Sequence, residues 1–203
     1  MSLPNDADIN QRIADRVRTL RAAQSLTLDA LAERSGVSRS MISLVERGES
    51  SPTAVLLEKL SAGLGTSLAS LFEALPQADA PPSPLSRHAE QTPWRDPESG
   101  YVRRNLSPPG VSHTLQLVEV AFPPGARVAY DSPPRGTPIE QQVWVLEGRI
   151  EIGVGEARWR LDAGDCLAMP MDGPNHFRNP TRKPARYLVA IAVGAHPLTK
   201  SSK

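Results

Sequence analysis

Residues that could recognise a nucleic acid lie on one side of a short segment, 38–47. Because successive residues of a helix are about 100° apart, the polar residues of this segment share a face. They are Arg39, Ser40, Ser43 and Arg47, with Leu44 at the edge of the face. The opposite side is apolar and carries Met41, Ile42 and Val45. The segment is therefore predicted to pack through one face and to leave the other face free.

The free face has the chemistry that a DNA major groove requires. An arginine can donate two hydrogen bonds to guanine, a serine pairs with several bases, and a leucine can touch a thymine methyl group. The alternative is that the polar face is only solvated, as the polar faces of most helices are. The sequence around this segment distinguishes the two interpretations.

Two helices are expected before this segment. Apolar residues recur at helical spacing from Ile9 to Leu20, which predicts an amphipathic helix of about four turns. Thr27 is a suitable N-cap for a second helix, and Asp29 favours the positive end of its dipole. Gly36 is expected to end that helix, because glycine adopts a positive φ at little cost.

Three further helices complete the predicted amino-terminal bundle. The third runs from Ser38, as its N-cap, to about Glu46. Ser51 and Pro52 offer an N-cap and a first helical residue for the fourth. Apolar residues at 68, 71 and 72 mark a fifth. Five such helices can share one small core.

The run 28–48, continued by 51–53 and 60–64, resembles the helix-turn-helix family of the Cro and lambda repressors, often called the Xre family. The resemblance covers about residues 10–74. It implies that the third helix lies in the major groove and that the DNA-contacting residues are Thr27, Ser38, Arg39, Ser40, Ser43, Leu44 and Arg47. Arg47 is expected near phosphate, as is Thr27 at a helix start. Leu28 departs from the family, because many relatives carry a phosphate-binding glutamine there.

The second half of the chain alternates in period two and is punctuated by turn residues. The predicted strands are 113–120, 141–146, 149–154, 157–161, 166–169 and 185–193. Short strands with regular turns are typical of an antiparallel sandwich or barrel. His113 could face either side of its strand.

The pairing of 141–151 with 164–170 and 175–179 resembles the two motifs of the cupin family. The resemblance spans about residues 111–193 and implies a double-stranded β-helix barrel. In metal-binding cupins two histidines, a glutamate and a third histidine hold the ion. At the family spacing these places are taken here by Arg135, Thr137, Gln141 and Asn175.

These four residues are poor ligands for a transition metal, which prefers imidazole and carboxylate donors and is repelled by an arginine cation. No bound metal or other cofactor is therefore expected. Glu140 and His176 each lie one residue from the motif, but a shift of one residue turns a strand side chain to the opposite face. We expect His176 at the rim of the barrel. Arg135, Thr137, Gln141 and Asn175 could instead bind a small polar or anionic effector.

Composition sets the remaining expectations. The chain has 203 residues, a net charge of +1 and one cysteine, Cys166, so a disulfide within the chain and a cysteine zinc cluster are excluded. Cys166 is expected to be a buried strand residue, with a redox-sensing thiol as the alternative. No signal peptide or membrane span is evident, so a cytoplasmic protein is expected.

The sequence predicts an α+β protein of two domains. Residues 9–75 form the five-helix DNA-binding domain, 76–94 a proline-rich linker that could hold the domains tens of ångströms apart, and 95–197 the all-β cupin barrel. We expect a transcription regulator, not an enzyme, that binds an operator in double-stranded DNA as a homodimer. The barrel would bind an effector, dimerise, or do both. The alternatives are a metal-dependent cupin isomerase or dioxygenase fused to a DNA-binding module, and an antitoxin-like binder of another protein.

Overall fold

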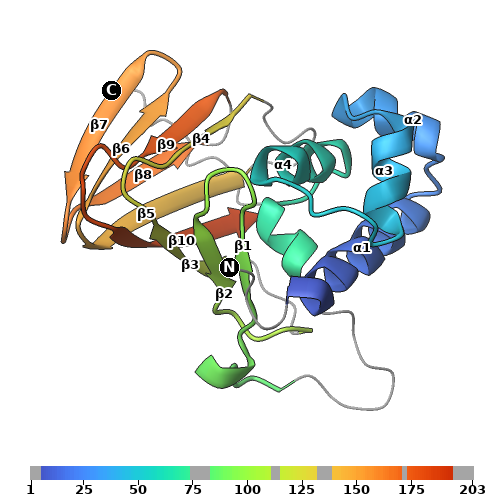
Figure 1. The fold of residues 1–203 in the computed structure, drawn as a ribbon, viewed down its shortest axis with the longest axis horizontal. Helices are drawn as coiled ribbons and strands as arrows, with labels where there is room; N and C mark the ends of the chain where they lie inside the picture. Colours follow the sequence, from blue (N-terminus) through green and yellow to red (C-terminus); the bar gives the residue numbers. More distant parts are fainter. Residues whose placement is uncertain (1–5, 74–82, 111–114, 132–138, 171–172, 194–203) are drawn as a thin grey trace, which may run out of the picture.

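The computed structural model describes residues 6–73, 83–110, 115–131, 139–170 and 173–193. Helices come first and strands second, as predicted (Figure 1). The α-helices of the described part are α1 (Asp6–Ala23), α2 (Leu28–Ser35), α3 (Arg39–Glu46) and α4 (Ala54–Gly63). Two 3-10 turns follow, η1 (Leu68–Phe72) and η2 (His88–Glu90).

Helix ends were predicted well where a hydroxyl caps a free N–H group. The Thr27 side chain accepts from the Ala30 N–H at 3.1 Å and begins α2, and Ser38 begins α3 in the same way. Gly36 ends α2 with a φ of 68°. The start of α4 was predicted two residues early, because Thr53 rather than Ser51 provides the cap.

The prediction of a fifth α-helix was wrong, because residues 68–72 form the short 3-10 turn η1. The Ser67 hydroxyl caps it by accepting from the Ser70 N–H at 3.1 Å. A five-residue segment is too short to propagate an α-helix on its own. Its buried residues, Leu71 and Phe72, nevertheless close the helical core as the sequence pattern indicated.

Apolar faces of the helices build one core in the amino-terminal region. Its fully buried side chains include Ile13, Val17, Leu31, Ile42, Leu57 and Leu60. Arg21 of α1 donates two hydrogen bonds to the Glu46 carboxylate of α3, at 2.6 and 2.7 Å. This pair raises the pKa of Arg21 and fixes α3 against α1.

Ten strands form two antiparallel sheets in the described part of the chain. The first has the order β1-β2-β3-β10-β5-β8 and the second β4-β9-β6-β7. The strands are β1 (Pro93–Arg95), β2 (Val102–Asn105), β3 (Leu115–Phe122), β4 (Arg127–Tyr130), β5 (Ile139–Glu147), β6 (Arg149–Val154), β7 (Ala157–Asp162), β8 (Cys166–Pro170), β9 (Asn175–Arg178) and β10 (Ala185–Val193).

The two sheets face each other across buried apolar side chains. Phe177 of β9 stacks on Tyr187 of β10, with ring centroids 6.0 Å apart. Hydrogen-bonded pairing joins the described strands into two sheets rather than one cylinder, so the closed barrel stays a prediction. The six predicted strands correspond to β3, β5, β6, β7, β8 and β10, whereas β1, β2, β4 and β9 were not predicted as strands. His113 lies outside the described residues.

Period-two alternation on β5 decides which side chains face the space between the sheets. Ile139, Gln141 and Val143 are buried, whereas Glu140 and Trp144 are exposed on the outer face. Trp144 is paired with Cys166 of β8, and the Cys166 thiol is also exposed. The prediction of a buried cysteine was therefore wrong, because β8 lies at the edge of its sheet, where this face is uncovered.

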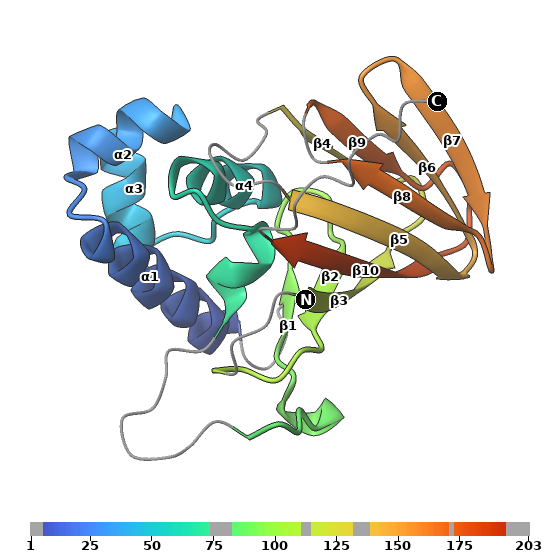
Figure 2. The same ribbon diagram turned by 180° about the vertical axis from the view of Figure 1, so that it is seen from behind.

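The helical region packs directly on the sheets: α1 contacts β1 of the first sheet, and α4 contacts β4 of the second (Figures 1 and 2). Trp94, which was assigned to the end of the linker, is a buried residue of β1, and its ring meets Phe72 of η1 edge-on at 5.1 Å. Buried residues of both regions belong to one continuous core. The linker could hold the two regions tens of ångströms apart, but in the structure they are in contact.

Candidate functional site

The polar face of α3 is open to solvent. Ser38, Arg39 and Ser40 are exposed, and Ser43 and Leu44 are partly exposed. On the other side of the helix, Ile42 is fully buried and Val45 nearly so. The structure thus brings together the residues predicted from the sequence and leaves them on an uncovered helix, at the far end of the helical region from the sheets (Figure 1).

The two arginines of this face have weak, exposed partners. Arg39 Nε lies 3.3 Å from Asp29 Oδ1, and both side chains are more than half exposed. Arg47 pairs with Glu49 at 2.7 Å, which raises the pKa of Arg47, and also donates to the Ser43 hydroxyl. Exposed ion pairs of this kind contribute little to stability, so a phosphate or a base can replace either acid at little cost.

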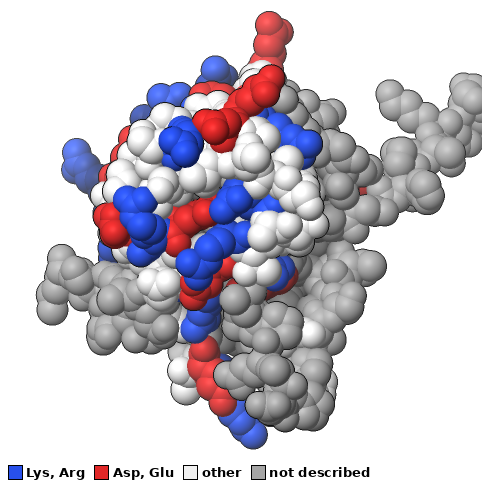
Figure 3. All heavy atoms as spheres, turned by 90° about the vertical axis from the view of Figure 1, so that its right-hand side faces the viewer, with Lys and Arg blue, Asp and Glu red and all other residues white. Residues whose placement is uncertain are grey.

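Basic and acidic side chains are interspersed on this end of the molecule (Figure 3). This agrees with the net charge of +1 and shows that a uniformly basic surface is not what marks the site. Thr27 is exposed at the start of α2, near the position where Leu28 replaces the family glutamine. The free N–H groups at the starts of α2 and α3 add donors for phosphate.

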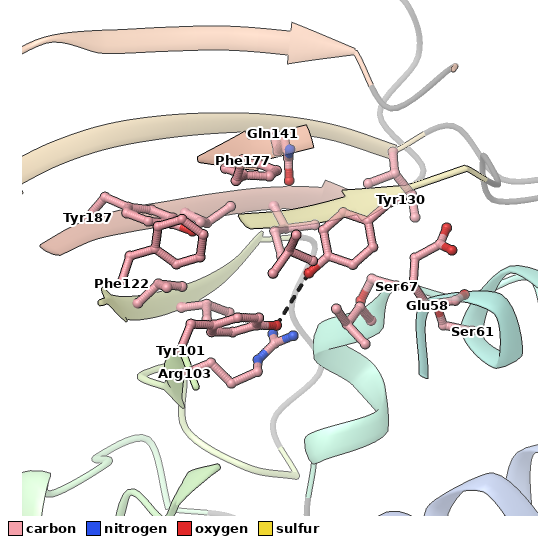
Figure 4. Close-up of a pocket in the computed structure, with 17 residues that line it drawn as sticks. Glu58, Ser61, Ser67, Tyr101, Arg103, Phe122, Tyr130, Gln141, Phe177 and Tyr187 are labelled. Atoms are coloured by element: carbon pink, nitrogen blue, oxygen red, sulfur yellow. Dashed lines mark hydrogen bonds between the residues drawn. The ribbon is translucent and has the colours of Figure 1, made fainter. Parts of the chain in front are cut away.

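A cavity of about 90 Å³ lies between the helical region and the inner faces of the two sheets (Figure 4). Its walls are mainly aliphatic and aromatic side chains of β3, β4, β9 and β10. The helical side of the cavity is formed by Glu58 and Ser61 of α4, by Ser67, and by Leu68 of η1. The cavity is therefore shared by the two regions.

The residues predicted for an effector pocket are only partly brought together. Gln141 lines the cavity, is 7% exposed, and has an Nε2 atom without a hydrogen-bond partner in the described structure. Asn175 is buried on β9, where its Nδ2 donates to the Gly173 carbonyl at 3.4 Å, and it is not among the described cavity residues. Arg135 and Thr137 lie outside the described residues.

The two ligands that a shifted register would supply point away from the cavity. Glu140 is exposed on the outer face of β5. His176 is half-buried against Gly153 of β6, where a Cβ atom on the glycine would lie 2.0 Å from the imidazole. Burial lowers the pKa of His176, and Arg158 and Arg127 lower it further. In the part of the chain that the structure describes, no three His, Cys, Asp or Glu side chains are grouped to hold a metal ion.

Glu58 is a cavity residue that the sequence did not single out. It is 5% exposed, and its Oε2 atom has no hydrogen-bond partner among the described residues. Burial raises its pKa to about 7, while Lys59 opposes the rise and Asp131 adds to it. One sequence feature indicates that α4 is more deeply buried than a surface helix. Its apolar residues, Val55, Leu56, Leu57 and Leu60, lie around more of the helix than the single stripe of a surface helix.

Arg103 of β2 is a second buried charge at the cavity. It is 5% exposed, its guanidinium carbon lies 4.3 Å from the centre of the Phe72 ring, and its Nε atom lacks a partner in the described structure. Nearby, the Tyr101 and Tyr130 hydroxyls lie 3.3 Å apart (Figure 4). Burial raises the pKa of both tyrosines, so their hydroxyls stay neutral.

Seven aromatic rings form a continuous chain from the helical region to the cavity. Successive ring centroids are 5.1 to 6.4 Å apart. The order is Phe72, Trp94, Tyr101, Phe122, Tyr187, Phe177 and Tyr130. The chain contains seven of the nine aromatic residues of the protein, so aromatic packing is concentrated at the cavity and the interface between regions.

Polar contacts also hold the two regions together. Asp96, which is 2% exposed, accepts from the Ala54 N–H at the start of α4 at 2.9 Å. Ser67 donates to Gln116 of β3 at 2.8 Å, and Asn105 donates to the Ala69 carbonyl at 3.0 Å. The helix that follows the candidate DNA-reading helix is thus anchored to the first sheet.

Comparison with known proteins supports both parts of the chain. A helix-turn-helix family model matches residues 17–71, and a cupin domain model matches residues 118–191. The HTH-type transcriptional regulator SutR of Escherichia coli (strain K12) is 26% identical over 168 residues, which cover 82% of this chain and 86% of SutR. The HTH-type transcriptional regulator PuuR of the same organism is 27% identical, with coverage of 81% and 85%.

A solved structure agrees in fold along nearly the whole chain. The HTH_3 family transcriptional regulator from Vibrio cholerae aligns with a TM-score of 0.72 and 28% identity, covering 92% of this chain and 98% of its own. None of the described helices is long and apolar enough to span a membrane. The chain is thus a DNA-binding transcription regulator that joins an Xre-type helix-turn-helix domain to a cupin domain.

Proposed function

We propose that α3 enters the major groove and reads the operator through its exposed face. Ser38, Arg39 and Ser40 are placed over base edges, with Ser43 and Leu44 further along the helix. Arg47 and Thr27 contact phosphate. The observation that carries the proposal is that this face is uncovered while the opposite face of α3 is buried in the helical core.

Arg39 is the residue to test first. Selection of bound fragments from the parent genome identifies the operator, and fluorescence anisotropy then measures affinity for operator and scrambled duplexes. Arg39→Ala is expected to weaken operator binding by roughly 1 to 3 kcal/mol and to relax one base preference. Arg182→Ala, an exposed change between β9 and β10, is the matched control.

The anisotropy result separates base contact from phosphate contact. An equal loss on operator and scrambled DNA would show that Arg39 contacts phosphate alone. Unchanged affinity for both duplexes would show that Arg39 does not contact DNA and would contradict the placement of α3 in the major groove.

We also propose that the protein binds DNA as a homodimer through the outer face of the first sheet, because helix-turn-helix dimers read half-sites about one helical turn apart. Trp144 and Leu115 are 48% and 49% exposed on this face. A hollow of about 240 Å³ beside Trp144 is lined mainly by small or apolar side chains, including Cys166, Leu188 and Ala190. Such a face can pair with a copy of itself.

Two tryptophan variants test the dimer. Trp144→Glu is expected to give monomers in analytical ultracentrifugation and to weaken operator binding. Trp159→Glu changes the 40% exposed tryptophan of β7 on the other sheet and should leave the dimer intact. A dimer that survives Trp144→Glu would exclude this face.

The proposed domain limits are 9–75 and 93–197, because Pro93 and Trp94 belong to β1, and the proposed location is the cytoplasm. We assign regulation rather than catalysis to the cupin domain, because Gln141 stands where a metal-binding cupin would carry a carboxylate. Metal analysis of the purified protein tests this: stoichiometric iron, manganese, nickel or zinc would favour a cupin enzyme. A small effector that binds in the cavity between the domains would regulate DNA binding.

A further inference from the structure

The cavity between the domains contains polar atoms that the protein itself does not satisfy. Among the described residues, Glu58 Oε2, Gln141 Nε2 and Arg103 Nε are buried and have no hydrogen-bond partner. Each belongs to a side chain that is more than nine-tenths buried and that lines the cavity. A buried polar group without a partner costs about 1 to 3 kcal/mol, more if it is charged.

The side chains that carry these atoms are an acid, a cation and an amide, and they come from different elements. Glu58 is on α4, Arg103 is on β2 and Gln141 is on β5, so they approach the cavity from separate sides (Figure 4). In the described part of the chain neither Glu58 nor Arg103 forms an ion pair. A molecule with a positive donor at one end and a carboxylate at the other would satisfy the acid and the cation together.

The remaining walls and the volume restrict that molecule. Its middle would contact aliphatic and aromatic side chains such as Val120, Ile191 and Phe177. A cavity of about 90 Å³ is smaller than the apolar cavities of about 150 Å³ that accept benzene. The occupant must therefore be small.

We propose that this cavity binds a small zwitterionic molecule of the amino-acid type, whose ammonium group faces Glu58 and whose carboxylate faces Arg103 and Gln141. The proposal rests on the function proposed above and names the chemical class of its effector. It replaces the site expected from the sequence, because a helix of the DNA-binding domain supplies the acidic ligand. Burial of Glu58 with a raised pKa agrees with a carboxyl group that lacks its cation.

The position of Glu58 couples the ligand to DNA binding. Glu58 is one turn along α4 from Ala54, whose N–H group is held by Asp96 of the other domain. The segment 47–53 joins α4 directly to α3. A ligand that pairs with Glu58 adds a contact between α4 and the sheet, and so favours one arrangement of the two domains over others.

Calorimetry and thermal unfolding of the full chain test the proposal. The probes are alanine, valine and 4-aminobutyrate, together with isovalerate, which lacks the amine of valine, and isobutylamine, which lacks the carboxylate. At least one amino acid is expected to bind and to raise the melting temperature. Removal of either charged group should weaken binding roughly ten- to hundredfold.

Three variants make the test specific to the cavity. Glu58→Gln and Gln141→Leu are expected to weaken amino-acid binding roughly tenfold or more. Glu156→Gln, in the exposed turn between β6 and β7, should bind as the wild type does. Circular dichroism verifies that each variant is folded.

Several results would overturn the proposal. They are equal binding of isovalerate and valine, equal binding by the wild type and both cavity variants, or no binding of any probe to a wild-type protein that still binds its operator. Operator binding is measured separately, without probes. If the wild type did not bind its operator, the proposed function would be contradicted. Binding of an amino acid measured by calorimetry would still support the proposed cavity ligand.

Discussion

Replacing Glu58 by glutamine should change how the stability of the protein depends on pH. The acid is buried beneath the cupin sheet, and its pKa is raised to about 7 from an ordinary value of 4.5. A pKa difference of one corresponds to about 1.4 kcal/mol. Ionising this carboxyl therefore costs about 3 kcal/mol more in the folded protein than in the unfolded chain. Glutamine keeps the shape of the side chain and never ionises.

The direction of the change in stability depends on whether the folded or the unfolded chain holds the proton at a given pH. Below pH 4.5 Glu58 is protonated in both the folded and the unfolded chain, so its ionisation contributes nothing. Between pH 4.5 and 7 the unfolded chain loses the proton while the folded protein retains it, and the wild type is progressively destabilised. Above pH 7 the full cost is present, so Glu58→Gln should then be more stable than the wild type by up to about 3 kcal/mol.

Charged and titratable groups around Glu58 set the size of the effect. Lys59 on the same helix favours the ionised form, and Asp131, which follows β4, opposes it. Across the cavity lie the Arg103 guanidinium and the neutral hydroxyls of Tyr101 and Tyr130. The transition near pH 7 is therefore assigned to Glu58.

Urea unfolding followed by circular dichroism from pH 4.5 to 8.5 measures the difference in free energy of unfolding. Glu156→Gln is the matched control, and its difference from the wild type should stay constant with pH. A constant difference for Glu58→Gln across this range would refute the argument. So would a wild type that gains stability relative to the variant as pH rises.

Three further changes have defined outcomes. A Cβ atom at position 63 would lie 2.8 Å from the Ser35 Cβ, so Gly63→Ala should separate α2 from α4 and cost about 1 to 3 kcal/mol in urea unfolding. Asp96→Ala removes the acceptor for the Ala54 N–H and should cost a similar free energy, about 1 to 3 kcal/mol, whereas the exposed Glu98→Ala should cost less than about 0.5 kcal/mol. Affinity for an amino-acid probe should rise through pH 7 and level off above it, because the ammonium group pairs with the ionised form of Glu58; calorimetry at pH 6, 7 and 8 would measure this, and a flat profile would contradict it.

Local chemistry made the limits of α3 and its free face predictable. The hydroxyl caps at Thr27 and Ser38 and the glycine at 36 fix the limits of α2 and α3 through contacts within a few residues. The apolar spacing of Ile42 and Val45 then decides which face of α3 is free. Sequence alone contains all of this information, because each contact is local or follows the period of the helix.

Contacts between distant segments could not be predicted in the same way. Asp96 lies in a turn after a three-residue strand, and its bond to Ala54 joins positions 42 residues apart. The strands β1 and β2 are too short to show a period. The cavity depends on the same long-range packing, so Gln141 was predicted from its motif while Glu58 and Arg103 were missed.

The arrangement of the domains favours control of geometry over simple blocking of the DNA site. Helix α3 lies on the side of the helical domain away from the sheets, and α4 lies between them (Figures 1 and 2). A ligand in the cavity therefore leaves the exposed Arg39 face open, and DNA and ligand can be bound together. In a dimer joined through the sheets, the packing of α4 on each sheet sets the distance between the two α3 helices. Because paired half-sites tolerate little change in that distance, a small shift of α4 is enough to alter operator affinity.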